Sequence, residues 1–433
     1  MDNSSAILSA REDRNNLIIK AAESSDIITV KANIPGADKH VKESYLLVRY
    51  FTNAVLHALG GKAEFYDCAD GVYAVIKTAG DNMKERTVEI EKTDRIGRFC
   101  DIDVYLKGAK CSLSRGYMRT CYICEQPAFV CSRQGNHTAE QLLGVLKRGT
   151  REYFSSILAD IIKQSLLAEL NLENKFGLVT PTSQGSHADL NYGIMLKSQD
   201  AIIPYLVQLF WAGFDSDGAE GLLSKLRPIG IEAENAMFEA VKTNTYKGFI
   251  FVAGVLLVSV GCVISRNECN FNDIFSTAAK ICNGITNELE NGGESNGITA
   301  YKNYKITGAR GHAEQGFPVV KSAIELIDGN TSPDNLLKVL CHIVGGIEDT
   351  VLLKRSKSLE KYLYFKHKIS SADIADKAQL KQLNEECIKN NISIGGSADI
   401  LATAIMLNKL RTLLFNKEKN NAKNPTCRRH GKN

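Results

Sequence analysis

The sequence predicts two domains, an N-terminal mixed α/β domain of the α+β kind and a C-terminal all-α domain. Its 433 residues exceed what one hydrophobic core usually supports. Strand-like and helix-like segments alternate over residues 1–150, whereas the apolar spacing is helical from Ser155 to about residue 415. No convincing alternating strand interrupts that second stretch.

The first half combines three predicted strands with two predicted helices. The strands, rich in β-branched or alternating residues, are Ile27–Ala32, Val72–Lys77 and Thr87–Glu91. The helices, judged by spacing, are Ile7–Lys20 and Val41–Leu59, and the second stops at Gly60-Gly61. We expect a further helix to end at Gly144–Thr150, where the two domains meet without a long linker.

Two aspartates, Asp101 and Asp103, are the central feature of the first half. They lie in the segment Arg98–Tyr105, where residues two apart on an extended strand face the same side. Two carboxylates on one side repel each other unless a cation lies between them, and Mg²⁺ binds one or two carboxylates together with substrate phosphates. The pair therefore indicates a phosphate-handling metal site; the alternative is a solvated edge strand.

Three cysteines and a histidine follow within a short stretch. Thiolate and imidazole groups can form a tetrahedral zinc site, and the candidate ligands are Cys121, Cys124, Cys131 and His137. The spacing differs from that of the usual zinc fingers, so a loop of unliganded thiols is the alternative.

The second half is expected to consist of helices. They are Ser155–Leu172, Ala201–Ala212, Ala233–Lys242, Phe249–Ile264, Phe271–Leu289, Phe317–Leu326, Asp334–Ile347 and Ser397–Leu414. The most apolar run, Gly248–Ile264, is at the short limit for a membrane span, and we interpret it as a buried core helix.

Composition narrows the class of protein. The net charge of +4 is concentrated in residues 416–433, which read as a disordered basic tail, so the remainder is near neutral and predicts no nucleic-acid partner. Twelve cysteines are too sparse for a disulfide scaffold, and the N-terminus is polar. We therefore expect a cytoplasmic protein with mostly free thiols and no membrane partner.

Five polar or glycine-rich groups lie at predicted helix ends in the second half. They are Gly185–Asp189, Thr243–Gly248, Thr307–Pro318, Gly345–Thr350 and Gly395–Asp399. Each alone is more typical of a cap or a turn. Together they favour a phosphate and metal cleft at converging helix ends, because helix N-termini attract anions.

Over residues 5–148 the chain resembles the apo-citrate lyase phosphoribosyl-dephospho-CoA transferase family, the holo-acyl-carrier-protein synthases of citrate lyase. The resemblance rests on ordered motifs: Ala10-Arg11-Glu12-x-Arg14, Asn33-Ile34-Pro35-Gly36-x-x-Lys39, Glu89-x-Glu91, Gly97-Arg98-x-x-Asp101-Ile102-Asp103, Leu113-Ser114-Arg115, Cys121-x-x-Cys124-Glu125, Cys131-x-Arg133 and His137. It implies a nucleotidyltransferase-like domain that moves phosphoribosyl-dephospho-CoA from its triphosphate to a serine of the apo acyl carrier protein, the gamma subunit of citrate lyase, with release of pyrophosphate. Asp94 stands where that family tends to have histidine.

That reaction needs a metal on the phosphates and cations for the leaving pyrophosphate. The resemblance implies that Asp101 and Asp103 bind Mg²⁺ and that Arg98 is a catalytic residue. Phosphate contacts are expected from Arg11, Arg14, Lys39 and Arg115, since guanidinium matches phosphate bidentately; a surface ion pair is the alternative for each. Glu89 either deprotonates the serine or is a third carboxylate on the metal.

Over residues 160–411 the chain resembles the triphosphoribosyl-dephospho-CoA synthase family. The anchors are Leu226-Arg227-Pro228-Ile229-Gly230, Asn244-Thr245-x-Lys247-Gly248, Thr307–Glu314 and Gly395–Asp399. Such enzymes use ATP and dephospho-CoA as substrates, with the 2′-hydroxyl of dephospho-CoA replacing adenine. The resemblance implies metal or hydroxyl activation at His187, Asp189, Glu234 and Asp349, and substrate or triphosphate binding at Asn244, Lys247, Arg310 and Glu314.

The second half departs from the family pattern at several positions, namely Thr180, Ser183, Ala236, Tyr246 and Val351. We therefore weigh two hypotheses. One is a bifunctional transferase that makes and attaches the citrate lyase prosthetic group. In the other, only the N-terminal transferase is active, or has another nucleotidyltransferase specificity, and the divergent half is a binding or assembly domain.

Overall fold

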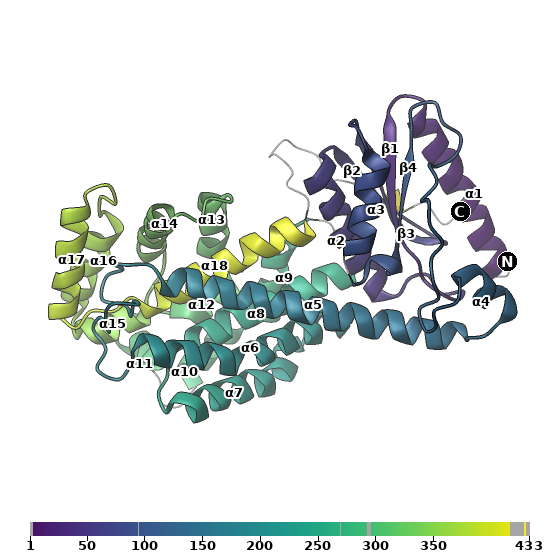
Figure 1. Cartoon of the computed structure of the whole chain (residues 1–433). Coiled ribbons are helices and arrows are strands. Elements are labelled where there is room, and N and C mark those ends of the chain that lie inside the picture. The colour runs from purple at the N-terminus through teal and green to yellow at the C-terminus, as the bar shows by residue number, and fades with distance from the viewer. Residues whose placement is uncertain (1–2, 94, 269, 292–295, 416–427, 430–433) are drawn as a thin grey trace. The chain divides into compact units, whose positions relative to one another are not determined.

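The computed structural model describes residues 3–93, 95–268, 270–291, 296–415 and 428–429. The chain forms two compact units. The first comprises residues 1–157, 264–270 and 411–433, and the second comprises residues 158–263 and 271–410. Figure 1 labels their elements along the chain.

An antiparallel sheet is the centre of the first unit. Its strands are β1 (Asp26–Ala32), β2 (Lys62–Cys68), β3 (Gly71–Thr78) and β4 (Cys100–Tyr105), in the order β4-β1-β3-β2. The register places Asp101 opposite Lys31 and Asp103 opposite Thr29. The short strand β5 (Arg428–Arg429) pairs in parallel with β2. Apart from these two residues, the predicted disordered tail 416–433 lies outside the described residues.

Helices cover both faces of this sheet (Figure 1). Helix α1 (Asn3–Ala22) packs through Ile18 and Ala22 on the face that carries Ile27, Tyr73 and Val75. The register puts Asp101 and Asp103 on that same face. Helices α2 (Lys42–Leu59) and α3 (Met83–Thr93) pack on the other side, where β4 alternates buried with half-buried residues.

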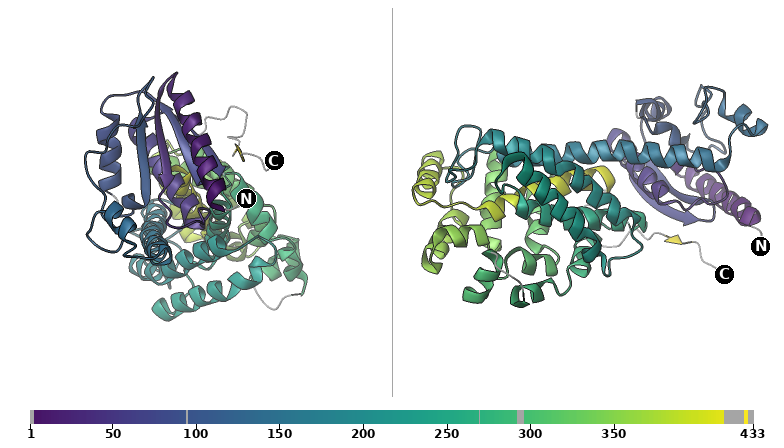
Figure 2. Two further views of the ribbon diagram at one scale, coloured as in Figure 1. Left: turned by 90° about the vertical axis from the view of Figure 1, so that its right-hand side faces the viewer. Right: turned by 90° about the horizontal axis from the view of Figure 1, so that it is seen from below.

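The segment that follows β4 leads through a loop to α4 (Ala128–Gln134) and then to α5 (Ala139–Leu170). Helix α5 is continuous, as Figure 2 shows. The expected helix end at Gly144–Thr150 is therefore wrong, because these residues lie inside α5. The apolar side chains Leu146, Phe154, Leu158 and Ile162 are buried along its length and favour its continuation.

The second unit is helical throughout the part that the structure describes. After α5 its longer helices are α6 (Tyr192–Asp215), α7 (Leu222–Val241), α8 (Lys247–Ser265), α14 (Pro333–Gly346), α16 (Leu359–Ser370), α17 (Lys377–Lys389) and α18 (Gly395–Leu414). The shorter ones are α9 (Asp273–Ile281), η2 (Ile285–Asn287), α10 (Glu288–Asn291), α11 (Asn296–Tyr304), α12 (Gly308–Glu314), α13 (Pro318–Ile327) and α15 (Thr350–Ser356).

Helix α8 is long and apolar enough to cross a membrane, but 89% of its most apolar window is buried inside the protein. Gly261 has no room for a side chain beside the backbone of Phe210 and Phe214, so α8 and α6 approach closely. The interpretation of Gly248–Ile264 as a core helix agrees with this burial.

Three further expectations about local structure are wrong. Thr87–Glu91 is part of α3 and not a strand, because the buried positions Met83, Thr87 and Glu91 recur every four residues. The predicted helix Phe271–Leu289 breaks after α9, where Gly284 has a positive φ of 77°. The stretch expected as a loop at Thr307–Pro318 contains α12, in which Gly311 packs directly against Thr307.

Candidate active sites in the two units

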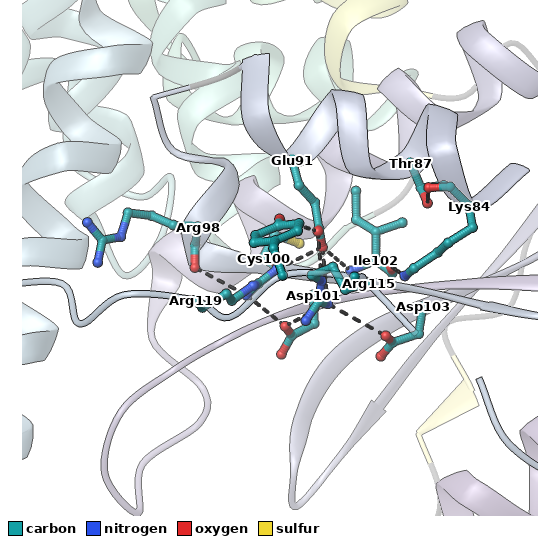
Figure 3. A network of polar contacts seen from close by, with 12 residues as sticks. Lys84, Thr87, Glu91, Arg98, Cys100, Asp101, Ile102, Asp103, Arg115 and Arg119 are labelled. Atoms are coloured by element: carbon teal, nitrogen blue, oxygen red, sulfur yellow. Dashed lines mark hydrogen bonds and ion pairs between the residues drawn. The ribbon is translucent and has the colours of Figure 1, made fainter. Parts of the chain in front are cut away.

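The two aspartates of β4, which we call the acidic pair, lie side by side on one face of the strand. Their side chains are 37% (Asp101) and 35% (Asp103) exposed. Arg115 Nη2 lies 3.3 Å from Asp101 Oδ1 and 3.6 Å from Asp103 Oδ1 (Figure 3). Burial, and next the charge of Asp101, raises the pKa of Asp103. One cationic nitrogen thus lies within 3.6 Å of both carboxylates.

A buried carboxylate orders the arginines beside the acidic pair. Glu91, on α3, accepts hydrogen bonds from Arg115 Nε at 2.9 Å, Arg119 Nη2 at 2.7 Å and Tyr117 Oη at 3.2 Å. It also accepts from the backbone N–H of Ile102 at 2.9 Å, which ties α3 to the edge of the sheet. Arg119 reaches Asp101 at 2.7 Å. With its oxygens already bonded, Glu91 is a positioning residue and not a metal ligand.

We predict that Glu91→Gln destabilises the first unit, because an amide cannot balance the two half-buried guanidinium groups of Arg115 and Arg119. The free energy of local opening should fall by about 3 kcal/mol. Hydrogen exchange at the Ile102 amide measures this change and should accelerate by about 100-fold. The matched control is Glu89→Gln on the same helix, where the side chain is exposed. Equal effects of the two substitutions would contradict the role given to Glu91.

Glu89 and Arg98 were expected to face the acidic pair, but neither side chain does so. Glu89 is exposed on α3, about half a turn away from Glu91, which removes the geometric basis for a third metal carboxylate there. Arg98 Nη2 donates to the carbonyl oxygens of Thr120 and Cys121. Its guanidinium group points away from the acidic pair in Figure 3.

A second group of cations surrounds Asp70, whose side chain is fully buried. We call it the Asp70 cluster: Arg11 Nε lies 2.9 Å and Lys31 Nζ 2.8 Å from the carboxylate, and Arg14 also donates to it. Burial alone would raise the pKa of Asp70, but Lys31 and the two arginines outweigh it and lower the pKa. Three cations against one anion leave positive charge on the face that carries the acidic pair.

Lys39, another predicted phosphate contact, lies near this cluster. Its Nζ donates to the carbonyl oxygen of Ile34 at 2.5 Å. Burial, and next the charge of Lys31, lowers the pKa of Lys39. A lysine whose charge is disfavoured by its neighbours gains most from an anionic ligand.

The cysteine–histidine cluster, consisting of Cys121, Cys124, Cys131 and His137, is compact. One ligand atom from each residue lies within 4.8 Å of every other. Burial raises the pKa of the Cys121 thiol, but the backbone N–H groups of Ile123 and Cys124 outweigh it and lower the pKa to about 7. The sequence prediction that these four residues come together agrees with this geometry.

In the second unit, the segment before α8 contacts several predicted site residues. Thr243 donates to Asp189 at 2.8 Å, and Lys247 Nζ lies 2.6 Å from Glu234. Asn244 accepts from the backbone N–H of Lys247. Predicted residues that are distant in sequence thus meet at the N-terminus of α8, where the helix dipole favours anions.

Two aspartates, the buried Asp349 and the half-buried Asp399, lie next to this helix end. Asp399 accepts from the Phe249 backbone N–H, and a side chain at Gly248 would collide with its carboxylate. Burial, and next the charge of Asp349, raises the pKa of Asp399 well above its usual range. Asp349 accepts from the Ser397 hydroxyl at 2.9 Å, and burial raises its pKa too. Such pKa values are typical of functional sites.

His187 is held between two partners. Its Nε2 lies 2.9 Å from the Ser393 hydroxyl, and Arg355 lies 2.8 Å from Nδ1. Burial, and next the charge of Arg355, lowers the pKa of His187 to about 4. The imidazole is therefore neutral at neutral pH, with Nδ1 as the acceptor for Arg355.

We predict that His187 shows no protonation step near the ordinary histidine pKa of 6.5. The proton binds only as pH falls toward 4, since the folded-state pKa is depressed. Arg355→Met removes the second cause and should raise the apparent pKa part of the way. Proton NMR of the His187 ring measures it; a wild-type midpoint near 6.5 would contradict the described contacts.

Arg310 and Glu314, on α12, have other partners. Arg310 pairs with Glu288 at 3.4 Å, and Glu288 also pairs with Arg227. Glu314 accepts from the backbone N–H of Gly284 and from the Thr286 hydroxyl. To contact substrate as predicted, Arg310 and Glu314 would have to leave these partners.

The departures from the family pattern are accommodated in the fold. Tyr246 is buried, and its hydroxyl accepts from Gln199 at 2.8 Å. The Thr180 backbone N–H bonds to the Ser183 carbonyl and closes a turn. Ala236 and Val351 are half-buried on α7 and α15.

Sequence reasoning missed five residues of these sites. They are Lys31, Asp70, Glu91, Arg119 and Asp399. Glu91 and Asp399 lie inside the motifs that carry the resemblances, and membership of those motifs is the one sequence signal that could have identified them. Asp70 and its arginines are 56 and 59 positions apart, and no spacing signals such a pair.

Comparisons with known proteins match both halves. Residues 3–153 match the family model described as apo-citrate lyase phosphoribosyl-dephospho-CoA transferase, and residues 155–417 match ATP:dephospho-CoA triphosphoribosyl transferase. The 2-(5''-triphosphoribosyl)-3'-dephosphocoenzyme-A synthase of Haemophilus ducreyi is 32% identical over 65% of this chain and 98% of its own length. Protein CitXG of Leuconostoc mesenteroides is 28% identical over 92% of this chain and 95% of its own, and Protein CitXG of Haemophilus influenzae is 26% identical over 94% and 96%.

Proposed function

The chain belongs to the ATP:dephospho-CoA triphosphoribosyl transferase family and carries an apo-citrate lyase phosphoribosyl-dephospho-CoA transferase domain, and from this we propose how one polypeptide makes and attaches the citrate lyase prosthetic group. The first reaction joins ATP to the 2′-hydroxyl of 3′-dephospho-CoA and releases adenine. The second transfers phosphoribosyl-dephospho-CoA to a serine and releases pyrophosphate. The predicted family membership is confirmed for both halves.

We assign the transfer to residues 1–150, a nucleotidyltransferase-like domain, and the synthesis to residues 151–415. The observation that carries the first assignment is the acidic pair, with one arginine nitrogen within 3.6 Å of both carboxylates. Hard divalent ions such as Mg²⁺ bind to such oxygen pairs with phosphate as a further ligand. When bound there, the ion would neutralise charge on the triphosphate as pyrophosphate departs.

The surrounding cations supply the rest of the anion site. Arg115 and Arg119 lie on the acidic pair, and the Asp70 cluster lies on the same sheet face, beginning with Lys31 opposite Asp101. We propose that Arg115 turns from Asp103 to the leaving pyrophosphate when the metal site fills. Guanidinium groups bind phosphate oxygens bidentately, which orients the leaving group. The acceptor is the apo acyl carrier protein, the gamma subunit of citrate lyase.

For the synthase half, the segment Thr243–Gly248 and the neighbouring carboxylates of Asp349 and Asp399 support a site at the N-terminus of α8. We assign phosphate binding there to Asn244 and Lys247, which border the N-terminus of α8, where the helix dipole favours anions. Asp189, Glu234 and the neutral His187 are the groups available to orient ATP or the attacking hydroxyl. Arg310 and Glu314 stay candidates for the triphosphate.

Free thiols support a reducing compartment. Among the described residues ten cysteines are free, as expected for cytoplasmic proteins. We propose a cytoplasmic enzyme that acts on ATP, dephospho-CoA and a carrier protein, without a nucleic-acid or membrane partner.

Two assays on the purified full chain test the proposal. With ATP, Mg²⁺ and dephospho-CoA, the protein should release adenine. With triphosphoribosyl-dephospho-CoA and apo carrier protein, it should give pyrophosphate and a carrier of increased mass. Carrier modification without adenine release would favour the alternative, in which the helical half is a binding or assembly domain.

A further inference from the structure

The cysteine–histidine cluster lies beside the acidic pair without belonging to it. Two features of its geometry point to a ligand. The four donor atoms lie within 4.8 Å of one another, close to the distance of about 3.8 Å that a tetrahedral site with 2.3 Å Zn–S bonds requires. In addition, Nε2 of His137 is buried and has no hydrogen-bond partner among the described residues.

The backbone around the cluster is built as a turn that presents its donors. The Cys121 N–H bonds to the Gln126 carbonyl, and the Ala128 N–H bonds to the Arg119 carbonyl, each at 2.8 Å. The Ile123 N–H points at the Cys121 sulfur at 3.5 Å. Helix α4 then supplies Cys131, and Gly135 ends it in the left-handed region, which returns the chain toward His137.

We propose that Cys121, Cys124, Cys131 and His137 bind one structural Zn²⁺ that orders residues 113–137 and thereby positions Arg115 and Arg119 on the acidic pair. Four protein ligands fill the tetrahedron, so the ion has no open position for chemistry. Its effect on the reaction passes through the arginines. This part of the inference rests on the proposed transfer function, whereas zinc binding does not.

The connection runs through short contacts. Arg119 begins the turn and reaches both Asp101 and Glu91 at 2.7 Å. Arg98 donates to the Thr120 carbonyl at 3.0 Å and to that of Cys121, and so ties the turn to the residues before β4. Few large apolar side chains anchor the segment, because Met118, Ile123 and Phe129 are exposed, so the ion would add to the polar contacts that order it.

The test compares Cys124→Ser with Cys111→Ser in the full chain. Cys111 is exposed and outside the cluster, which makes it the matched control. Elemental analysis should find one zinc per wild-type and Cys111→Ser chain and at least about 10-fold less in Cys124→Ser. Hydrogen exchange over residues 113–137 should accelerate only in Cys124→Ser. His137→Cys should keep the zinc, because a thiolate replaces the imidazole.

Carrier loading by Cys124→Ser should fall by about 10- to 100-fold, mainly in kcat, while adenine release stays at the wild-type rate and shows that the second unit is folded. Equal zinc in Cys124→Ser and Cys111→Ser, or no zinc in wild-type protein purified without chelators, would overturn the site. Loss of zinc with unchanged exchange and unchanged loading would overturn its positioning role. Absence of carrier loading in wild type, with zinc and exchange as expected, would refute the transfer function alone.

Discussion

Asp103→Asn will abolish carrier loading, with a loss of at least about 100-fold in kcat, and will leave adenine release at the wild-type rate. The substitution keeps the size of the side chain but removes one of the two charges that the metal requires. It also relieves repulsion, since burial and the neighbouring Asp101 raise the pKa of Asp103. The folded state should therefore be as stable as wild type or more so.

Mass spectrometry of the carrier protein and coupled detection of pyrophosphate measure the loading. Asp101→Asn should act in the same direction but with some loss of order, because Arg119 also binds Asp101. The matched control is Asp81→Asn, an exposed aspartate in the same unit. Carrier loading at the wild-type rate by both Asp101→Asn and Asp103→Asn would contradict metal binding by the acidic pair.

Asp399→Asn will show the reciprocal pattern, with adenine release reduced by about 100-fold or more and carrier loading from supplied triphosphate unchanged. Asp399 is half-buried beside Asp349 at the N-terminus of α8, and its pKa lies well above the usual range. A group with a raised pKa costs folding free energy at neutral pH, and asparagine removes that cost. Stability should thus hold or increase while activity falls, which separates a functional carboxylate from a structural one.

The control for this change is Asp200→Asn, which removes an exposed carboxylate paired with Lys163. Chromatography of released adenine and thermal unfolding are read on the same preparations. Unchanged adenine release with lower stability would make Asp399 a helix cap only. Both interpretations of Asp399 require that the wild-type protein releases adenine, so that activity is measured first.

Local patterns predicted much of the fold. The β-branched run became β1, the aspartates two apart share one face of β4, and the most apolar run became the buried helix α8. Where pattern and structure differ, packing decided. The alternation of Thr87–Glu91 is compatible with a strand, but the segment is helical because a helix buries Met83, Thr87 and Glu91 on one face. Gly311 suited a loop, yet its lack of a side chain lets α12 turn against Thr307.

The candidate sites were predictable only in part, because ion pairs between distant segments leave no local signal. The spacing of Asp101 and Asp103 indicated the acidic pair. Nothing in the spacing distinguishes Glu91, which orders the arginines, from Glu89, which is exposed on the same helix. The role of Asp70 likewise could not be predicted from the sequence, because only the fold brings Arg11, Arg14 and Lys31 to its carboxylate.

Metal binding by the acidic pair is the central claim, and electron paramagnetic resonance of Mn²⁺, a substitute for Mg²⁺, tests it most directly. The titration uses the full chain with zinc and triphosphoribosyl-dephospho-CoA present and compares wild type, Asp81→Asn and an Asp101→Asn/Asp103→Asn variant. The account predicts one tightly bound Mn²⁺ in the first two and at least about 10-fold weaker binding in the third. Equal Mn²⁺ binding by all three proteins would contradict it.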